Sequence, residues 1–217
     1  QDSLMKGRGR LMEHMEYDMD RKNEKDGKNI EYNVVREEAA YNAKPYDGYT
    51  IEDYCAIPED QRVELIDGVL YDVASPGITH QSISMSLSIQ IGTYINKKGG
   101  NCRVFAGPID VQLVNDNRTM LVPDIIVVCD PDKVKKERIV GAPDFVVEII
   151  SHSSRKRDYE IKMKKYNAAG VREYWIVDPE RERVLVYDFE GKSAPVIYGM
   201  DEKIPVRIFS GELVIAF

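Results

Sequence analysis

Two uninterrupted apolar runs, DIIVVC (124–129) and DFVVEII (144–150), constrain the fold of this chain more than any other feature. Strands that read as continuous apolar runs are usually central strands of a sheet that is covered on both faces. Around these runs, the patterned segments follow the order helix, several strands, helix, strand and a β-rich tail. This order predicts an α/β fold with a central mixed β-sheet flanked by helices and extra β-strands at the C-terminus.

Capping and turn signals predict the remaining elements. Thr50 precedes IEDYCAI, with Asp53 in the first turn, as at a helix N-cap. The dipeptide Asp67-Gly68 predicts a hairpin within RVELIDGVLYDVA. One helix is predicted to end at Gly99-Gly100 and another, over residues 158–169, to end at Gly170. The further strand candidates are CRVFAG, IDVQLV, EYWIVD, RVLVYDF, APVIYG and ELVIAF.

The chain of 217 residues fits one domain with an appendage. Residues 1–45 are polar and lack a clear period, so we interpret them as an appendage or a partner-binding arm. Residues 46–217 are predicted to form the folded domain. No run of about 18 apolar residues occurs, and the N-terminus has no apolar signal region, so we expect no membrane contact and a cytoplasmic location.

The three cysteines lie far apart and form no CxxC pattern, which argues against a zinc site. We therefore expect Cys55, Cys102 and Cys129 to be buried free thiols in a reducing cytosol.

The net charge of −7 argues against a nonspecific nucleic-acid coat, which normally carries a basic excess. One segment is basic nevertheless, and it could be a solvated helix face or a local contact surface for phosphates. Its basic residues are Arg155, Lys156, Arg157, Lys162, Lys164 and Lys165.

The second apolar run contains one carboxylate in its middle, Glu148. Successive side chains of a strand point to opposite faces, so Val146, Glu148 and Ile150 share one face. A buried carboxylate without a partner is costly, so Glu148 should contact a cation, bind a metal or have a raised pKa. A Glu at a wet sheet edge or in a structural ion pair is the alternative. We favour a functional Glu148, because isolated buried acids are rare outside functional sites.

The other apolar run opens with Asp124. Asp at the start of a strand is common turn chemistry, and Pro-Asp recurs at Pro131 and Pro143, so the motif is weak by itself. Neighbouring central strands could nevertheless bring the carboxylates of Asp124 and Glu148 side by side. Two carboxylates with several waters would suit Mg²⁺.

A cation for this site could come from the helix predicted over residues 158–169. Asp158, Lys162 and Tyr166 are spaced by four residues and would share one face of that helix. The helix follows the Glu148 strand after a short loop and could place the Lys162 ammonium beside the carboxylates. The alternative is an exposed Asp158–Lys162 pair worth about 0.3–0.5 kcal/mol.

Several stretches resemble the Uma2 family (DUF820), which is similar to the PD-(D/E)XK restriction-endonuclease-like nucleases. The resemblance covers about residues 46–190 in the same order, and implies a restriction-endonuclease-like αβββαβ core. In that core the lysine has moved to the following helix from the strand position that Ile150 occupies here. The stretches are VELIDGVLYDVASPGITHQSI, LVPDIIVV, GAPDFVVEIIS and D-x-x-x-K-x-x-x-Y-x-x-x-GVREYWIVDP.

The resemblance assigns roles to individual residues. It implies that Asp124 and Glu148 are the metal-binding acids and that Lys162 is the displaced catalytic lysine, with Asp158 and Tyr166 as accessory residues on the same helix. The implied cofactor is Mg²⁺ or Mn²⁺.

Two further positions match the family, and one departs from it. Glu64 could be a further acid near the metal, or a surface residue beside the hairpin. His80 could orient a phosphate or a metal-bound water, or be satisfied by the helix backbone. The family often has Pro where this chain has His152, which we expect to alter the loop more than the chemistry.

These expectations combine into a divalent-metal-dependent endonuclease that hydrolyses DNA phosphodiester bonds. A bound metal would activate water, and Lys162 would stabilise the developing charge. The alternative is a non-catalytic nucleic-acid-binding or regulatory module on the same fold. A carboxylate-pair hydrolase acting on sugars is less favoured, because the single Trp175 lies inside a strand. DNA is the expected partner, and a homodimer is left open.

Overall fold

The computed structural model describes residues 48–58, 60–113, 116–152, 154–191 and 194–217, together with the backbone of three short strands nearer the N-terminus. Contacts divide the chain into two compact units, Gln1–Asn33 and Val34–Phe217. The first unit contains the antiparallel strands β1 (Glu24–Lys25) and β2 (Lys28–Asn29). Most of the predicted appendage, residues 1–45, lies outside the described residues.

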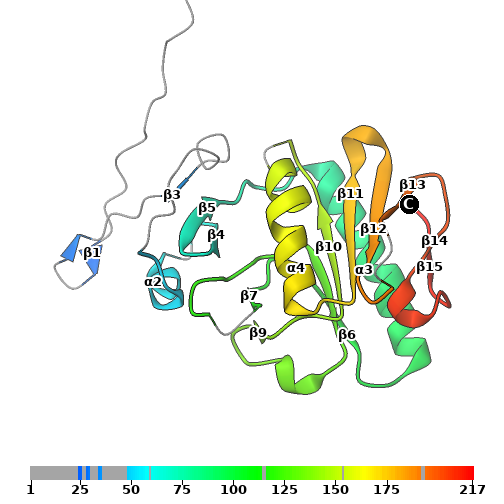
Figure 1. The fold of residues 1–217 in the computed structure, drawn as a ribbon, viewed down its shortest axis with the longest axis horizontal. Coiled ribbons are helices and arrows are strands. Elements are labelled where there is room, and N and C mark those ends of the chain that lie inside the picture. Colours follow the sequence, from blue (N-terminus) through cyan, green and yellow to red (C-terminus); the bar gives the residue numbers. More distant parts are fainter. Residues whose placement is uncertain are drawn as a thin grey trace, which may run out of the picture. The chain divides into compact units, whose positions relative to one another are not determined.

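A six-stranded mixed sheet forms the centre of the second unit, in the order β13-β12-β11-β10-β8-β6 (Figure 1). Only β10 and β11 are parallel neighbours, and every other adjacent pair is antiparallel. The two apolar runs form β8 and β10, which are adjacent and fully buried, as predicted. The strands are β6 (Arg103–Ala106), β8 (Ile125–Val128), β10 (Phe145–Ile149), β11 (Glu173–Asp178), β12 (Arg183–Asp188) and β13 (Val196–Gly199).

One long helix and one short helix cover the two faces of this sheet (Figure 1). The long helix, α3 (Ile78–Lys98), buries Leu87, Ile91 and Ile95 at helical spacing in one apolar core. The short helix, α4 (Met163–Ala169), lies on the other face and contributes to a second core with Tyr166. The alternation of side chains along β10 and β11 supplies both cores, because odd and even positions point to opposite faces.

A smaller three-stranded sheet holds the predicted hairpin. Strands β4 (Val63–Ile66) and β5 (Val69–Asp72) are antiparallel, and β3 (Val34–Val35) pairs with β5 in parallel. The turn residues Asp67 and Gly68 both have positive φ, the backbone conformation that a tight two-residue hairpin requires. The β4–β5 hairpin is preceded by helix α2 (Ile51–Ala56), whose N-terminus carries the capping box of Thr50 and Asp53.

The short remaining elements complete the fold. Two peripheral strand pairs are formed by β7 with β9 and by β14 with β15. The 3₁₀ turns are η1 (Pro131–Lys133), η3 (Pro179–Arg181) and η4 (Arg207–Phe209). The four peripheral strands are β7 (Val111–Gln112), β9 (Ile139–Val140), β14 (Ile204–Pro205) and β15 (Val214–Ile215).

Three predicted elements differ in extent or type. The helix expected over residues 158–169 begins as a π-helix, η2 (Arg157–Lys162), and becomes α-helical only from Met163. The strands expected over 109–114 and 212–217 are only two residues long, as β7 and β15. Their alternating apolar residues pack inward, but each strand is part of a two-stranded sheet of only two residue pairs.

The prediction of three buried free thiols is wrong. Cys102 and Cys129 form a disulfide, and Cys55 is free but exposed. Arg103 of β6 pairs with Val128 of β8, so the two bonded cysteines occupy the next positions on neighbouring strands. This proximity arises from strand pairing across a sequence separation of 27 residues, which the spacing of the cysteines does not reveal. The cysteines therefore give no support for a reducing compartment.

No helix among the described residues is long and apolar enough to cross a membrane. The cytoplasmic location and the homodimer stay predictions.

Candidate active site

Two predicted acids are brought together by the pairing of β8 and β10. Val147 pairs with Ile125, and continuing this antiparallel register by one position places Asp124 opposite Glu148. Cross-strand neighbours point to the same face of a sheet. Asp124 also accepts a hydrogen bond from the main-chain N–H of Ile149 through Oδ2, at 2.7 Å. The two acids thus occupy opposite positions where β8 and β10 pair, as the prediction requires.

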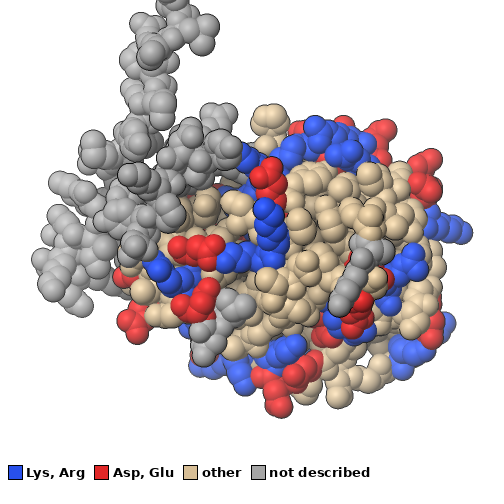
Figure 2. Space-filling model, in the orientation of Figure 1, with Lys and Arg blue, Asp and Glu red and all other residues tan. Residues whose placement is uncertain are grey.

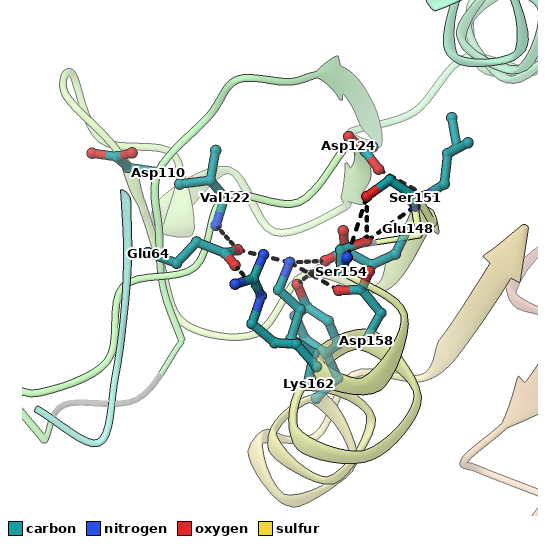
Figure 3. A network of polar contacts seen from close by, with 12 residues as sticks. Glu64, Asp110, Val122, Asp124, Glu148, Ser151, Ser154, Asp158 and Lys162 are labelled. Atoms are coloured by element: carbon teal, nitrogen blue, oxygen red, sulfur yellow. Dashed lines mark hydrogen bonds and ion pairs between the residues drawn. The ribbon is translucent and has the colours of Figure 1, made fainter. Parts of the chain in front are cut away.

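Glu148 receives its hydrogen bonds from the helical layer above the sheet (Figure 3). Lys162 Nζ donates to Oε1 of Glu148 at 2.9 Å, and the hydroxyl of Tyr166 donates to the same oxygen at 2.7 Å. Lys162 lies at the end of η2 and Tyr166 lies in α4, so both approach the sheet from the same side. The helix thus supplies the cation that the strand lacks at Ile150.

Glu64 reaches the same lysine from the β4–β5 hairpin. Its Oε1 lies 2.7 Å from Lys162 Nζ and accepts a hydrogen bond from the main-chain N–H of Val122 at 2.8 Å. The residue is 1% exposed. Glu64 is therefore a buried member of the site, and its alternative interpretation as a surface residue is wrong.

Arg157 is also part of this buried network. Its Nε lies 3.3 Å from Oε2 of Glu64, and its Nη1 donates to the carbonyl oxygen of Asp72 at 3.4 Å. Its guanidinium carbon lies 5.5 Å from the ring centroid of Tyr71, within the range of a cation–π contact. Because Arg157 is 5% exposed, the prediction that it contacts nucleic acid directly is not supported by its position.

The helical spacing of Asp158, Lys162 and Tyr166 serves the buried site, so the alternative of an exposed ion pair is wrong. Oδ1 of Asp158 lies 3.4 Å from Lys162 Nζ, and both side chains are almost completely buried. Burial raises the pKa of Asp158 from 3.8 to about 6, against the opposing effects of Lys162 and Arg157. Asp158 therefore holds a proton more readily than an exposed aspartate does.

Burial and charge also shift the pKa of the central pair. Burial raises the pKa of Glu148 well above 4.5, which Lys162 opposes and the other carboxylates reinforce. For Lys162, burial by itself lowers the pKa, but Glu148, Glu64 and Asp158 raise it above its ordinary value. The ammonium of Lys162 is thus held in its charged form by the carboxylates around it.

His80 and Asp124 form the more exposed end of the network. Nε2 of His80 lies 3.1 Å from Oδ1 of Asp124, with side chains 19% and 25% exposed. Burial lowers the pKa of His80, but the hydrogen bonds to Asp124 and to the main chain of Ile149 raise it above its ordinary value. His80 thus contacts a predicted metal-binding acid from the first turn of α3, and its interpretation as a histidine satisfied by its own helix is not supported.

The other predicted nucleic-acid contacts have different surroundings. Arg155 forms ion pairs with Asp178 and Glu180, and Lys165 pairs with Asp67. Lys156 and Lys164 are exposed, as is His152. Figure 2 shows Lys and Arg interspersed with Asp and Glu on the face that carries α4, without one continuous basic patch.

Four contributors to the site give little or no signal in the sequence. The main-chain N–H of Val122 and the carbonyl of Asp72 carry no side-chain signal at all. Tyr71 reads as an ordinary alternating residue of the hairpin. For Arg157, the one signal in the sequence is that it directly precedes Asp158, which lies on the predicted helical face of the site.

The donor set fits a small divalent cation. The carboxylates of Glu64, Glu148 and Asp158 lie around the Lys162 ammonium, and Glu64 also faces Arg157. A fourth carboxylate, that of Asp124, contacts His80 and the main-chain N–H of Ile149. These four carboxylates outnumber the two cations, Arg157 and Lys162. Two buried oxygens, Glu64 Oε2 and Asp158 Oδ1, also lack a hydrogen-bond donor. Such a surplus of carboxylate oxygen favours a hard cation.

Water would have to complete the coordination of that cation. Within the described part of the chain, no group of three or more His, Cys, Asp or Glu side chains could hold a metal by itself. Mg²⁺ usually keeps several waters and takes only one or two carboxylates from the protein. Asp124 and Glu148 are therefore the residues that could supply those carboxylates.

Comparison with known families assigns the chain to one of them. The family model of Uma2, described as "putative restriction endonuclease", matches residues 51–217. The chain belongs to the Uma2 family. This confirms the resemblance drawn from the ELIDG, PDIIVV and DFVVEII stretches, and the match extends through the C-terminal strands.

Two known proteins illustrate the extent of the similarity. An uncharacterized protein of Synechocystis sp. is 30% identical over 124 residues, which are 56% of this chain and 64% of that protein. A crystal structure titled as a putative nuclease of DUF820 from Anabaena variabilis has a TM-score of 0.63 at 22% identity. The alignment covers 78% of this chain and 95% of that structure, so the two proteins share the same fold.

Proposed function

We propose that this Uma2 protein is a divalent-metal-dependent endonuclease that hydrolyses phosphodiester bonds in DNA. One observation carries the proposal: Glu148 of β10, which the strand register places opposite Asp124 at the start of β8, contacts a buried lysine that comes from the following helix. The membership in a family described as restriction endonucleases gives this arrangement a chemical context.

The side chains divide the work between metal binding and charge stabilisation. Asp124 and Glu148 would hold Mg²⁺ or Mn²⁺, which when bound lowers the pKa of a coordinated water and polarises a phosphate. Tyr166 fixes the orientation of Glu148 by donating to Oε1. Lys162, which stays charged beside Glu148, would stabilise the negative charge that develops on the phosphate.

The geometry also suggests the side from which the substrate would approach. Glu148 and Lys162 are each 3% exposed, whereas His80 and Asp124 retain a partly exposed side chain. A phosphate backbone would therefore meet the site at the Asp124 end. Lys156 and Lys164 are exposed basic residues that could contact neighbouring phosphates.

A nucleic-acid-binding or regulatory module without cleavage is the second candidate. The observation that favours it is the direct hydrogen bond between Lys162 and Glu148, which engages the two groups that cleavage needs with each other. A fold can be retained after its chemistry is lost.

Cleavage assays with defined metals separate the two candidates. We would offer the protein supercoiled plasmid, single strands and branched junctions in EDTA, Mg²⁺, Mn²⁺ or Ca²⁺. Cleavage is expected in Mg²⁺ and Mn²⁺, none in EDTA, and little in Ca²⁺, which has longer ligand distances and activates water less well.

The Asp124→Asn protein is the control for this assay. It removes one negative charge but keeps the shape of the side chain, so loss of cleavage excludes a contaminating nuclease. DNA binding without cleavage of any substrate in Mn²⁺ would favour the binding module. Failure to bind either DNA or metal would contradict both candidates.

A further inference from the structure

The position of the Lys162 ammonium is set by three carboxylates from three different elements. Oε1 of Glu64 in β4 lies at 2.7 Å, Oε1 of Glu148 in β10 at 2.9 Å, and Oδ1 of Asp158 in η2 at 3.4 Å. Glu148 accepts a hydrogen bond from this ammonium, and Glu64 and Asp158 face it as ion pairs. Because the Lys162 side chain is only 4% exposed, water cannot readily replace a lost carboxylate.

Of these three acids, Glu64 depends most on a second cation. Its Oε1 is engaged by Lys162 and by the N–H of Val122. Its Oε2 is buried without a hydrogen-bond donor, and it faces Nε of Arg157 at 3.3 Å as an ion pair. A buried carboxylate oxygen without any counter-charge is unfavourable, so Arg157 stabilises the orientation in which Glu64 can reach Lys162.

Arg157 is itself held in place by the neighbouring strand of the hairpin. Its guanidinium lies over the ring of Tyr71 and donates to the carbonyl oxygen of Asp72. Planar guanidinium groups can combine stacking with hydrogen bonds in several directions, which the compact ammonium of lysine cannot do. Arg157 therefore connects β4 and β5 to the helical segment that carries Lys162 five residues later.

We propose that Arg157 is a positioning residue for Lys162 and that it acts through Glu64. Without the guanidinium, Glu64, Glu148 and Asp158 would share one buried cation. Glu64 would then turn away, and the Lys162 ammonium would lose one of its three carboxylate partners. The relevance of this role to DNA cleavage rests on the proposed nuclease function. The effect of Arg157 on the position of Lys162 does not.

Hydrogen exchange of the Lys162 ammonium measures this arrangement directly. In ¹⁵N-labelled protein without metal or DNA, an ammonium held by three carboxylates exchanges slowly enough to be observed, and its signal is identified by its loss in Lys162→Ala. Arg157→Gln and Glu64→Gln should each accelerate this exchange about tenfold, and the double variant should add little, because both changes remove the same contact.

A purely structural role for Arg157 predicts a different result. Loosening of the whole fold would accelerate exchange of the buried Ile149 amide in the same proportion as that of the ammonium, which would overturn the proposal. Additive effects in the double variant, or no observable ammonium in the wild-type protein, would overturn it as well. Arg172→Gln, which breaks ion pairs with Asp144 and Glu190 instead, should leave the exchange unchanged.

The outcome stays decisive if Arg157→Gln does not fold. The double variant, which removes the charges of both Arg157 and Glu64, is then compared with Glu64→Gln alone. Equal exchange supports the proposal, and faster exchange in the double variant contradicts it. If the wild-type protein cleaves no DNA, the nuclease proposal fails, but exchange of the Lys162 ammonium still tests the role of Arg157. If the wild-type protein cleaves DNA and the exchange is unchanged in the variants, only the proposed role of Arg157 fails.

Discussion

Glu148 illustrates how one residue can be costly for the fold and useful for chemistry. Its carboxylate lies in the middle of a buried strand, and burial raises its pKa well above 4.5. Lys162 and Tyr166 donate to one of its oxygens, and the lysine has two further carboxylates beside it. Lys162, the cation that stabilises this buried acid, is therefore also held by two other carboxylates.

Replacement of Glu148 by Gln should therefore abolish metal binding and cleavage while the protein stays folded. Glu64 and Asp158 still neutralise Lys162 in this variant, so the free energy of unfolding without metal should be equal to the wild-type value or slightly higher. Calorimetric titration with Mn²⁺ and urea unfolding measure the two quantities. Equal Mn²⁺ affinity in both proteins would exclude Glu148 as a ligand.

The raised pKa of Asp158 should make the stability of the protein depend on pH. Its pKa is raised from 3.8 to about 6, so the folded protein keeps a proton that the unfolded chain loses at lower pH. Its contribution to stability is therefore present in acid and is lost as the pH rises from about 4 to about 6. Across this window the full effect is at most about 3 kcal/mol.

Comparison of Asp158→Asn with the wild-type protein isolates this contribution. The free energy of unfolding of the variant, relative to that of wild type, should rise between pH 4 and 6 and stay constant at higher pH. Urea unfolding at a series of pH values measures it. A relative stability that is independent of pH, or that falls over this interval, would show that Asp158 ionises normally in the folded state.

At the scale of elements, buried polar side chains fix segments that have few strand pairs of their own. The C-terminal strands β14 and β15 share only two residue pairs. The adjacent turn η4 is attached to the central sheet by Glu173 of β11, which accepts hydrogen bonds from the N–H of Ile208 at 2.9 Å and from the indole N–H of Trp175 at 2.7 Å. Glu173 is fully buried on the side of the sheet opposite Glu148.

Glu173→Leu should consequently destabilise the protein by about 3 kcal/mol, because two buried N–H donors lose their acceptor. Fluorescence of Trp175, the single tryptophan of the chain, reports unfolding in urea. Glu190→Gln, which alters an exposed ion pair with Arg172, should change the stability by no more than about 0.5 kcal/mol. Similar effects of the two substitutions would exclude an anchoring role for Glu173.

At the scale of the whole molecule, the boundary between the two compact units falls between Asn33 and Val34. The sequence places the folded domain at residues 46–217 instead. The difference is β3, which pairs in parallel with Leu70 and Tyr71 of β5. Tyr71 also packs against Arg157. Strand β3 therefore supports the β4–β5 hairpin, which supplies Glu64 to the site.

Two shortened proteins test where the domain begins. A protein of residues 34–217 keeps β3 and should unfold within about 2 °C of the full chain, whereas residues 46–217 should unfold several degrees lower. Calorimetry measures both midpoints under the same conditions. Equal midpoints for the two shortened proteins would place the boundary at residue 46.

Local sequence patterns predict the central strands, the hairpin turn and the residue types of the candidate site. Continuous apolar runs specify buried strands, and the one acid inside such a run marks Glu148 because an unpaired buried charge is unfavourable. The spacing of four residues places Asp158, Lys162 and Tyr166 on one helical face. These signals are local, so they can be read without knowing how distant segments meet.

The partners of each of these groups depend on how distant segments meet in the folded chain. The Cys102–Cys129 disulfide depends on the pairing of β6 with β8, and the burial of Arg157 depends on how the hairpin meets η2. An arginine in a basic segment reads as a surface residue, because its sequence neighbours do not show the carboxylate of Glu64 more than 90 residues earlier. The physical reason is that ion pairs and cross-strand contacts are set by distance in space, whereas sequence patterns report only the environment along one element.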